Sequence, residues 1–226
     1  GIKLTDKPNL EFSDKYSAEH AQNYRDKHRR SGWRSLSNRW EHRMARKALH
    51  MAGDPKSILD LPCGAGRFWA MLAEDPQREL YAADNSQNMV EVADRSHPPE
   101  IRNRFTLFQT SAFAIDLPDE KVDCVFCMRL LHHIVDPQHR LQIYREFHRV
   151  TRDSVVLSLW VDGNYKAWKR RRLENRRHTK PYVNRIVLPR GQVEAEFREA
   201  GFDIVGHVDF LPRYALWRTY VLARKS

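Results

Sequence analysis

The chain has 226 residues, of which 41% are apolar and 30% charged, and it carries a formal net charge of +10. This length supports one sizeable hydrophobic core, so we expect a single domain over residues 1–226. The apolar fraction excludes an intrinsically disordered chain, and the sequence has no run of about eighteen apolar residues that could form a membrane-spanning helix.

The N-terminus and the cysteines bear on the compartment. Residues 1–16 have neither the apolar core nor the small-residue cleavage site of a secretory signal, and a start at Gly1 rather than Met indicates a trimmed terminus. The cysteines are Cys63, Cys124 and Cys127, and a small odd number argues against a disulfide framework. We therefore expect a cytoplasmic protein.

Positive charge is concentrated in two segments. Residues 20–50 hold nine Lys and Arg against two acids, and residues 166–190 hold ten against one, whereas residues 51–165 carry a net charge of −5. Such clustering indicates an anionic partner, an acidic protein or RNA, contacted by these two segments. The alternative is a solvated face with charge pairs along helices.

The first fifty residues predict two helices, of which the second places Trp33, Leu36, Trp40 and Met44 on one face. We expect this face to pack onto the rest of the domain. From about residue 57 to 160, strand-like runs alternate with helical spacing, which is typical of βαβ units and a parallel sheet. The predicted strands are 57–61, 79–83, 105–109, 122–128 and 154–159, and the predicted helices between them are 67–74, 86–95 and 138–150.

A further helix, residues 191–200, is predicted to end at Gly201. Residues 202–210 and 217–223 predict two strands, which must run antiparallel because no helix lies between them. The sequence therefore predicts an α/β fold: a doubly wound, Rossmann-like, seven-stranded sheet that is mostly parallel, with an antiparallel C-terminal strand and an N-terminal helical extension.

Cys124 and Cys127 form a CxxC pair, a spacing found in metal sites. They lie in a predicted strand, where a separation of three residues places the side chains on opposite faces. The sequence has no second ligand pair with zinc spacing. We therefore expect no metal site.

The turn after the first predicted strand is rich in small residues, as a ligand lying against the backbone requires. Two alignments with the dinucleotide-binding motif GxGxxG are possible. Both fail, because Arg67 or Trp69 stands where the third glycine allows close packing beneath a pyrophosphate. The turn is therefore suited to a nucleoside and argues against a nicotinamide oxidoreductase.

Asp60, Gly64 and Gly66 resemble the first motif of class I S-adenosylmethionine-dependent methyltransferases, with Pro62 in place of the first glycine. The resemblance runs from about residue 57 to the C-terminus. Asp84 matches the family carboxylate that accepts hydrogen bonds from both ribose hydroxyls. The resemblance implies the cofactor S-adenosylmethionine, bound by Asp60, Cys63, Gly64, Gly66, Asp84, Asn85, Met89, Ser111, Ala112, Phe113, Met128 and Arg129.

The adenine and methionine ends of the cofactor are placed by the same resemblance. Ser111 stands where the family usually has an aspartate beside the adenine, so we expect modest cofactor affinity. LHHIVDP, residues 131–137, is similar to the LHHxxDP block of the subgroup that includes quinone C-methyltransferases. Met128 and Arg129 are then expected near the methionine moiety, and His133 is the candidate general base. The alternative is that the tandem His132–His133 is structural.

The resemblance implies an enzyme that transfers a methyl group to an N or O nucleophile. In this family the N-terminal helices, here residues 1–52 as a lid or extension, and the segment after the fifth strand, here a basic insertion over 162–190, border the cofactor mouth of the core, 53–226. Because both are basic, we expect an acidic or phosphate-bearing acceptor, a macromolecule such as a protein lysine or RNA. The alternatives are a small-molecule methyltransferase, a catalytically silent cofactor-binding regulatory protein, and a nucleic-acid-binding protein with a vestigial enzyme fold.

Overall fold

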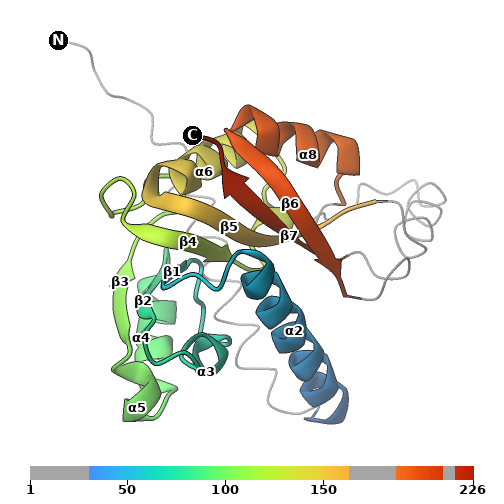
Figure 1. Ribbon diagram of the computed structural model, residues 1–226. Coiled ribbons are helices and arrows are strands. Elements are labelled where there is room, and N and C mark those ends of the chain that lie inside the picture. The colour runs from blue at the N-terminus through green and yellow to red at the C-terminus, as the bar shows by residue number, and fades with distance from the viewer. Residues whose placement is uncertain (1–30, 163–186, 211–216) are drawn as a thin grey trace.

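A computed structural model describes residues 31–162, 187–210 and 217–226, without the side chains of 31–36 (Figure 1). Within these residues, seven strands form one sheet in the order β3-β2-β1-β4-β5-β7-β6. The strands are β1 Ser57–Asp60, β2 Glu79–Asp84, β3 Phe105–Gln109, β4 Val122–Cys127, β5 Thr151–Trp160, β6 Phe202–Asp209 and β7 Trp217–Arg224. β1 to β5 run parallel, and β7 pairs antiparallel with both β5 and β6. The predicted fold class is confirmed.

Helices cover both faces of the sheet (Figure 1). α2 and α3 pack on one face, and α6 and α8 pack on the other. This two-sided cover explains why the central strands read as continuous apolar runs rather than as alternating ones. The described helices are α2 Ser31–Met51, α3 Trp69–Leu72, α4 Gln87–Arg95, α5 Pro99–Arg102, the 3-10 helix η2 Leu131–His133, α6 Pro137–Val150 and α8 Arg190–Glu199.

The two cysteines of β4 face opposite sides of the sheet, as their spacing predicts. Cys124 packs with Phe126 and Val156 on the α2 side, and Cys127 packs with Val125 and Leu157 on the α6 side. No group of three or more His, Cys, Asp or Glu side chains among the described residues could hold a metal ion. None of the described helices has the length and apolarity needed to cross a membrane.

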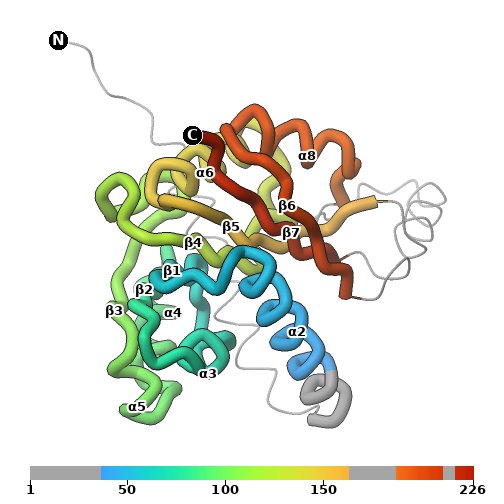
Figure 2. The backbone as a smooth tube through the Cα atoms, viewed as in Figure 1, coloured from blue at the N-terminus to red at the C-terminus, as the bar shows by residue number. Residues whose placement is uncertain are grey.

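α2 is part of the core through its C-terminal half. Ala45, Ala48 and Leu49 are buried beside Met44 and bring the helix against β6 and β7. The small alanines allow this close approach and widen the predicted packing face, of which Met44 is buried and Trp40 contacts the ring of Phe210. Trp40 is 41% exposed at the rim, while the side chains of the other two predicted positions, 33 and 36, lie outside the described residues. Figure 2 shows how this early segment lies beside the last strands of the chain.

α3 is shorter than the predicted helix over residues 67–74. The chain passes through turns up to Phe68, and Gly66 has a φ of 80°, which a right-handed helix does not allow. β5, in contrast, is longer than predicted, because the chain goes from α6 directly into extended backbone at Thr151. Arg152 and Asp153 are therefore part of β5.

Candidate functional site

The residues implied for the cofactor gather at one edge of the sheet. Asp60 and Asp84 are the last residues of β1 and β2, and Met128 directly follows β4. Ser111 lies just beyond β3. Because these four strands are parallel, their carboxyl ends meet at the same edge, which is where sheets of this kind bind ligands.

Backbone hydrogen bonds fix the turn after β1 against the end of β2. The N–H of Cys63 donates to Ala83 O at 2.8 Å, and the N–H of Gly64 donates to Asp84 Oδ2 at 3.0 Å. The Leu61–Pro62 peptide bond is cis. The first-motif turn and the end of β2 at Asp84 are therefore joined into one structural unit.

The two glycines of the turn serve different purposes. Gly64 has a φ of 54°, and a Cβ there would meet only Met89 Cε, at 3.9 Å, so the space above this backbone is open. At Gly66, a Cβ would overlap the His97 ring and lie 2.7 Å from Trp69 Cδ2. Gly66 was expected to leave room for a ligand. Its space is instead filled by the stacked rings of Trp69 and His97, whose centroids are 4.7 Å apart.

Asp84 is a buried carboxylate with capacity for further hydrogen bonds. Its side chain is fixed by two backbone donors, since Oδ2 accepts from Gly64 N at 3.0 Å and Oδ1 accepts from Ser86 N at 2.9 Å. Burial raises the pKa of Asp84 in spite of these bonds. Each carboxylate oxygen can accept a second hydrogen bond, which matches the two hydroxyls of a ribose.

Asp60 carries an acceptor that the described residues leave unused. Its Oδ2 and the Nε1 of Trp69 are both buried without a hydrogen bond among these residues. The indole lies close enough to favour the ionised carboxylate, but burial dominates and raises the pKa of Asp60 well above its usual range. An unsatisfied buried acceptor beside an open glycine backbone fits a ligand that brings its own donors.

At the expected adenine position, Ser111 uses its hydroxyl locally. Ser111 Oγ accepts from Phe113 N at 3.1 Å, which holds the turn after β3. Ala112 is buried, and Phe113 places its ring edge on His139 with centroids 5.8 Å apart. Asn85 accepts at its backbone oxygen from Gln109 Nε2 at 2.9 Å. No charged group is contributed by these positions.

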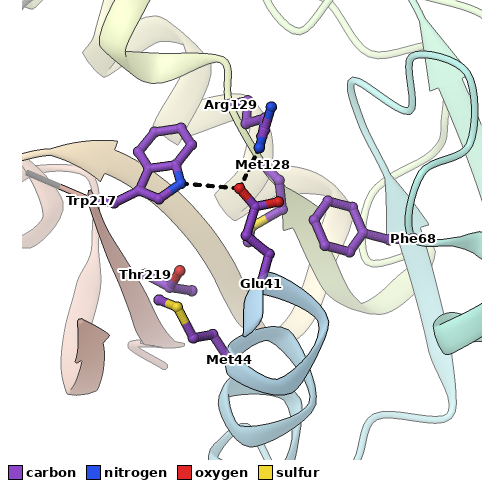
Figure 3. A pocket seen from close by; sticks show the side chains of 7 residues that line it. All are labelled: Glu41, Met44, Phe68, Met128, Arg129, Trp217 and Thr219. Carbon is purple, nitrogen blue, oxygen red and sulfur yellow. Dashed lines mark hydrogen bonds and ion pairs between the residues drawn. The ribbon is translucent and has the colours of Figure 1, made fainter. Parts of the chain in front are cut away.

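A small hollow lies beside this edge, between α2, the end of β4 and the start of β7. Figure 3 shows its lining side chains pointing toward one another from these elements. The described residues that line it are Glu41, Met44, Phe68, Met128, Arg129, Trp217 and Thr219. Among the positions implied by the sequence, Met128 and Arg129 are thus brought to the hollow.

Glu41 of α2 joins two of the cofactor loops. Arg67 Nη2 lies 2.6 Å from Glu41 Oε2, and Arg129 Nη2 donates to Glu41 Oε1. Trp217 Nε1 donates to the same Oε1 at 3.4 Å. Burial, together with the nearby Arg129, lowers the pKa of Arg67 to about 10, so Arg67 is charged at neutral pH.

The sequence interpretation missed this cluster. Glu41 is the single acid between Asp26 and Asp54, on a helix that is otherwise basic. Its position three residues before Met44 puts it on the buried face. A lone acid on the buried side of a basic helix was the available signal.

His133, the candidate general base, does not line the hollow. Its ring packs on His132, with centroids 4.0 Å apart. His132 is buried, stacks on Trp160 at 5.0 Å and meets the edge of Trp217 at 5.0 Å. Of this aromatic cluster, Trp217 lines the hollow.

Comparison with known proteins agrees with this geometry. Residues 58–154 match a family model described as a methyltransferase domain. The match extends over the centre of the chain, from β1 to the start of β5. This match agrees with the expected enzyme class, a methyltransferase that uses S-adenosylmethionine.

Two curated relatives resemble part of this chain. An uncharacterized methyltransferase-like protein of Schizosaccharomyces pombe is 31% identical over 88 residues, which are 39% of this chain and 32% of the relative. Demethylmenaquinone methyltransferase of Geobacillus kaustophilus is 29% identical over 99 residues, which are 43% of this chain and 41% of the relative. The chain therefore spans well under half the length of these relatives in the matched regions.

Solved structures share the fold. Magnesium protoporphyrin IX methyltransferase from Synechocystis, crystallised with bound SAH (S-adenosylhomocysteine), superposes with a TM-score of 0.73 at 15% identity, covering 95% of this chain and 98% of the other. The S-adenosylmethionine-dependent methyltransferase SibL superposes with a TM-score of 0.66 at 19% identity, covering 86% and 56%. At these identities the similarity shows the methyltransferase fold alone.

Proposed function

We propose that this chain binds S-adenosylmethionine at the carboxyl edge of its sheet and transfers the methyl group to an N or O nucleophile of an anionic acceptor. The observation that carries the proposal is the pairing of Asp84 with Gly64. A buried carboxylate with spare acceptor capacity lies beside glycine backbone with open space above it. The methyltransferase domain match supports the same conclusion.

Each part of the edge has a task in this proposal. Asp84 accepts hydrogen bonds from the two ribose hydroxyls. The turn from Cys63 to Gly66 lets the nucleoside lie close to the backbone. Ser111, Ala112 and Phe113 border the adenine. When bound, S-adenosylmethionine supplies a methyl group on a positively charged sulfur. The chain contributes orientation and exclusion of water, which are the main needs of an in-line methyl transfer.

The hollow is the proposed approach of the acceptor to the methyl group. Met44, Phe68 and Met128 give it apolar walls that exclude water, and Arg129 brings a positive charge. A side chain can remove the acceptor proton, for which His133 is our candidate. Because His133 lies outside the lining of the hollow, the acceptor must extend past that lining to reach it. An amine acceptor that arrives neutral needs no such base.

The charge of the described surface supports an anionic acceptor. Arg39, Arg43 and Lys47 are exposed on α2 at intervals of four residues, and none of them pairs with an acid among the described residues. Arg46 is engaged instead with Glu74. Together with the basic segment over 166–190, this favours a macromolecular acceptor, a protein lysine or RNA.

A small-molecule acceptor is the second candidate. It is favoured by the LHHIVDP block of residues 131–137 and by the likeness to a demethylmenaquinone methyltransferase.

Transfer of a labelled methyl group separates these candidates. The chain is incubated with methyl-labelled S-adenosylmethionine and a cell lysate fractionated into protein, RNA, lipid and metabolites. We expect label in protein or RNA. Label only in lipid or metabolites supports the small-molecule candidate. No label in any fraction, with SAH binding intact in calorimetry, supports a silent cofactor-binding protein.

A further inference from the structure

The cluster around Glu41 connects three distant segments at the border between the cofactor edge and the hollow. Arg67 follows the first motif, Arg129 follows β4, and Glu41 comes from α2. One carboxylate thus serves two guanidiniums, so these three side chains, taken by themselves, carry a formal net charge of +1. Trp217 adds one weak hydrogen bond from β7. Such a cluster has the charge to accept a second carboxylate.

Arg67 has donors left over for a ligand. Its Nε is buried without a hydrogen bond among the described residues. Its Nη2 is within 2.6 Å of Glu41 Oε2, but that oxygen has no hydrogen bond of proper geometry. A guanidinium offers five donors in a planar fork that matches a carboxylate. The ion pair with Glu41 therefore leaves hydrogen-bond donors of Arg67 unsatisfied among the described residues.

Arg129 is held in an uncommon backbone conformation. Its φ is 65°, in the left-handed region that non-glycine residues rarely adopt, and its N–H donates to Ser158 Oγ at 2.9 Å. Strain of this kind is found where a side chain must be aimed at a functional position. Here it directs Arg129 to Glu41 at the wall of the hollow (Figure 3).

The strand order gives the direction in which the cofactor extends. The adenine is expected beyond β3 and the ribose at Asp84 on β2, and the next strands in the sheet are β1 and β4. The amino-acid end must therefore extend toward the end of β4, about 10 Å away at two strand spacings. Arg129 lies there, immediately after Met128.

We propose that Arg67 and Arg129 form a carboxylate-binding site, which Glu41 fills in the free protein and the amino-acid carboxylate of the cofactor takes over on binding. The inference rests on the proposed function. Glu41 is then an internal competitor of the cofactor. Occupancy of the site releases α2 from two ion pairs and so couples cofactor binding to the helix that carries the basic surface.

Two ligands that differ in the carboxylate test this proposal by calorimetry on the full chain. SAH carries the amino-acid end, and 5′-methylthioadenosine shares its nucleoside and thioether but lacks that end. Arg129→Met and Arg67→Met are each expected to weaken SAH binding at least tenfold. Binding of 5′-methylthioadenosine is expected to change less than twofold. Arg145→Met, on the exposed face of α6, is the matched control and leaves both affinities unchanged.

Glu41→Gln separates competition from positioning. If Glu41 competes for the arginines, this variant binds SAH at least threefold more tightly and 5′-methylthioadenosine equally well. If Glu41 only positions the arginines, the folded variant binds SAH more weakly, and the proposal is overturned. Circular dichroism and thermal unfolding establish that the variant is folded.

A second readout on the unaltered chain covers the case in which Glu41→Gln does not fold. The indole N–H of Trp217, assigned with Trp217→Phe, donates to Glu41. Its NMR resonance is expected to shift on addition of SAH and to shift much less with 5′-methylthioadenosine. Equal shifts with both ligands overturn the proposal. The proposal is also overturned if Arg67→Met and Arg129→Met leave the ratio of SAH affinity to 5′-methylthioadenosine affinity unchanged. If neither ligand binds the unaltered chain, the proposed function itself is overturned.

Discussion

Asp84 combines a structural and a binding role in one carboxylate. It is 4% exposed and holds the turn at Gly64 and the start of α4 at Ser86 through backbone donors. The cost of burying it is offset in part by those two bonds, and the remaining acceptor capacity is left for a ligand. Binding and local folding are therefore linked at this residue.

Replacement of this carboxylate should weaken cofactor binding. In Asp84→Ala the dissociation constant of SAH is expected to rise at least tenfold, because each hydrogen bond to a charged group contributes about 1.5–3 kcal/mol and about 1.4 kcal/mol is a factor of ten. Calorimetry measures the change. Asp153→Ala, an exposed position in β5, is the control and leaves the constant unchanged. An unaltered affinity in Asp84→Ala contradicts the ribose role.

The three cysteines should be unreactive in the native protein. All three are buried, and burial raises the pKa of Cys124 to about 12 and those of Cys63 and Cys127 further still. Because the thiolate is the reactive form, we expect almost no labelling by Ellman's reagent at pH 8. In guanidinium chloride, all three thiols should react. Rapid native labelling, or stoichiometric zinc in elemental analysis, contradicts this picture.

At the scale of elements, α2 is both a core helix and a border of the site. Its C-terminal half packs on β6 and β7, and its N-terminal half brings Glu41 and His42 to the first-motif turn. The helix therefore connects the core with the hollow.

Truncation of a buried α2 side chain should lower stability strongly. Leu49 is fully enclosed, so Leu49→Ala is expected to lower the free energy of unfolding by about 2–5 kcal/mol, through lost burial and the cavity left behind. Urea denaturation measures this quantity. Lys47→Ala, two residues away and exposed, should stay within about 0.5 kcal/mol of the parent. If Leu49→Ala also changed the free energy of unfolding by only about 0.5 kcal/mol, α2 would be packed only loosely on the sheet.

His42 should have a lower pKa than an ordinary histidine. Its Nε2 lies 3.0 Å from Arg67 O, and burial, which outweighs that bond, lowers its pKa from 6.5. The unfolded chain then takes up the proton first as pH falls. His42 therefore contributes stability above about pH 6.5 and loses it on acidification toward its folded pKa. An NMR titration, assigned with His42→Asn, checks this, and a midpoint at or above 6.5 contradicts it.

The strands could be predicted closely because burial on both sides leaves a continuous apolar run. β3 has the predicted bounds, and β1, β2 and β4 differ from them by one residue. Asp60 and Asp84 were placed correctly because each ends such a run. The packing reason for Gly66 could not be predicted, since the rings that fill the space beside it come from Trp69 and from His97 far along the chain.

The hollow could not be predicted from local pattern. Glu41 and Trp217 are 176 positions apart, and only the tertiary fold brings them together. Helical periodicity predicts which side of α2 is buried, but it does not predict which strands that side packs against. The ion pairs of Glu41 with Arg67 and Arg129 depend on how α2 is laid across the sheet.

At the scale of the whole molecule, the charge is divided between a slightly acidic middle and basic flanking segments. α2 contributes exposed Arg39, Arg43 and Lys47 near the hollow. The second basic segment, residues 166–190, lies mostly outside the described residues. An anionic acceptor would be attracted to this side over a distance set by ionic strength.

Reversal of charge in the second segment should affect the acceptor and spare the cofactor. Arg170, Arg171 and Arg172 changed together to Glu are expected to raise the acceptor KM at least tenfold, mostly through slower association, with the SAH dissociation constant nearly unchanged. Added salt should imitate the change, because exposed charges are screened beyond about 10 Å at 0.1 M. Steady-state kinetics and calorimetry measure the two constants.

The control for this variant makes an equal change of charge elsewhere, at exposed Arg95, Arg145 and Arg198. It should leave the acceptor KM near that of the parent. If the acceptor is duplex nucleic acid, log affinity falls linearly with log salt, with a slope of about −0.9 per neutralised phosphate. Equal acceptor kinetics in the variant and the parent would mean that the arginines only solvate the surface.

The walls of the hollow come from opposite ends of the described chain, Glu41 and Met44 on one side and Trp217 and Thr219 on the other. The cofactor edge is built mostly from consecutive βα units. Contacts between neighbours in sequence form early in folding, and contacts across long separations form late. Until β7 enters between β5 and β6, the edge of β5 is unpaired and open to association with other chains. An acceptor that needs the hollow will therefore bind only to chains that have completed folding through their last strand.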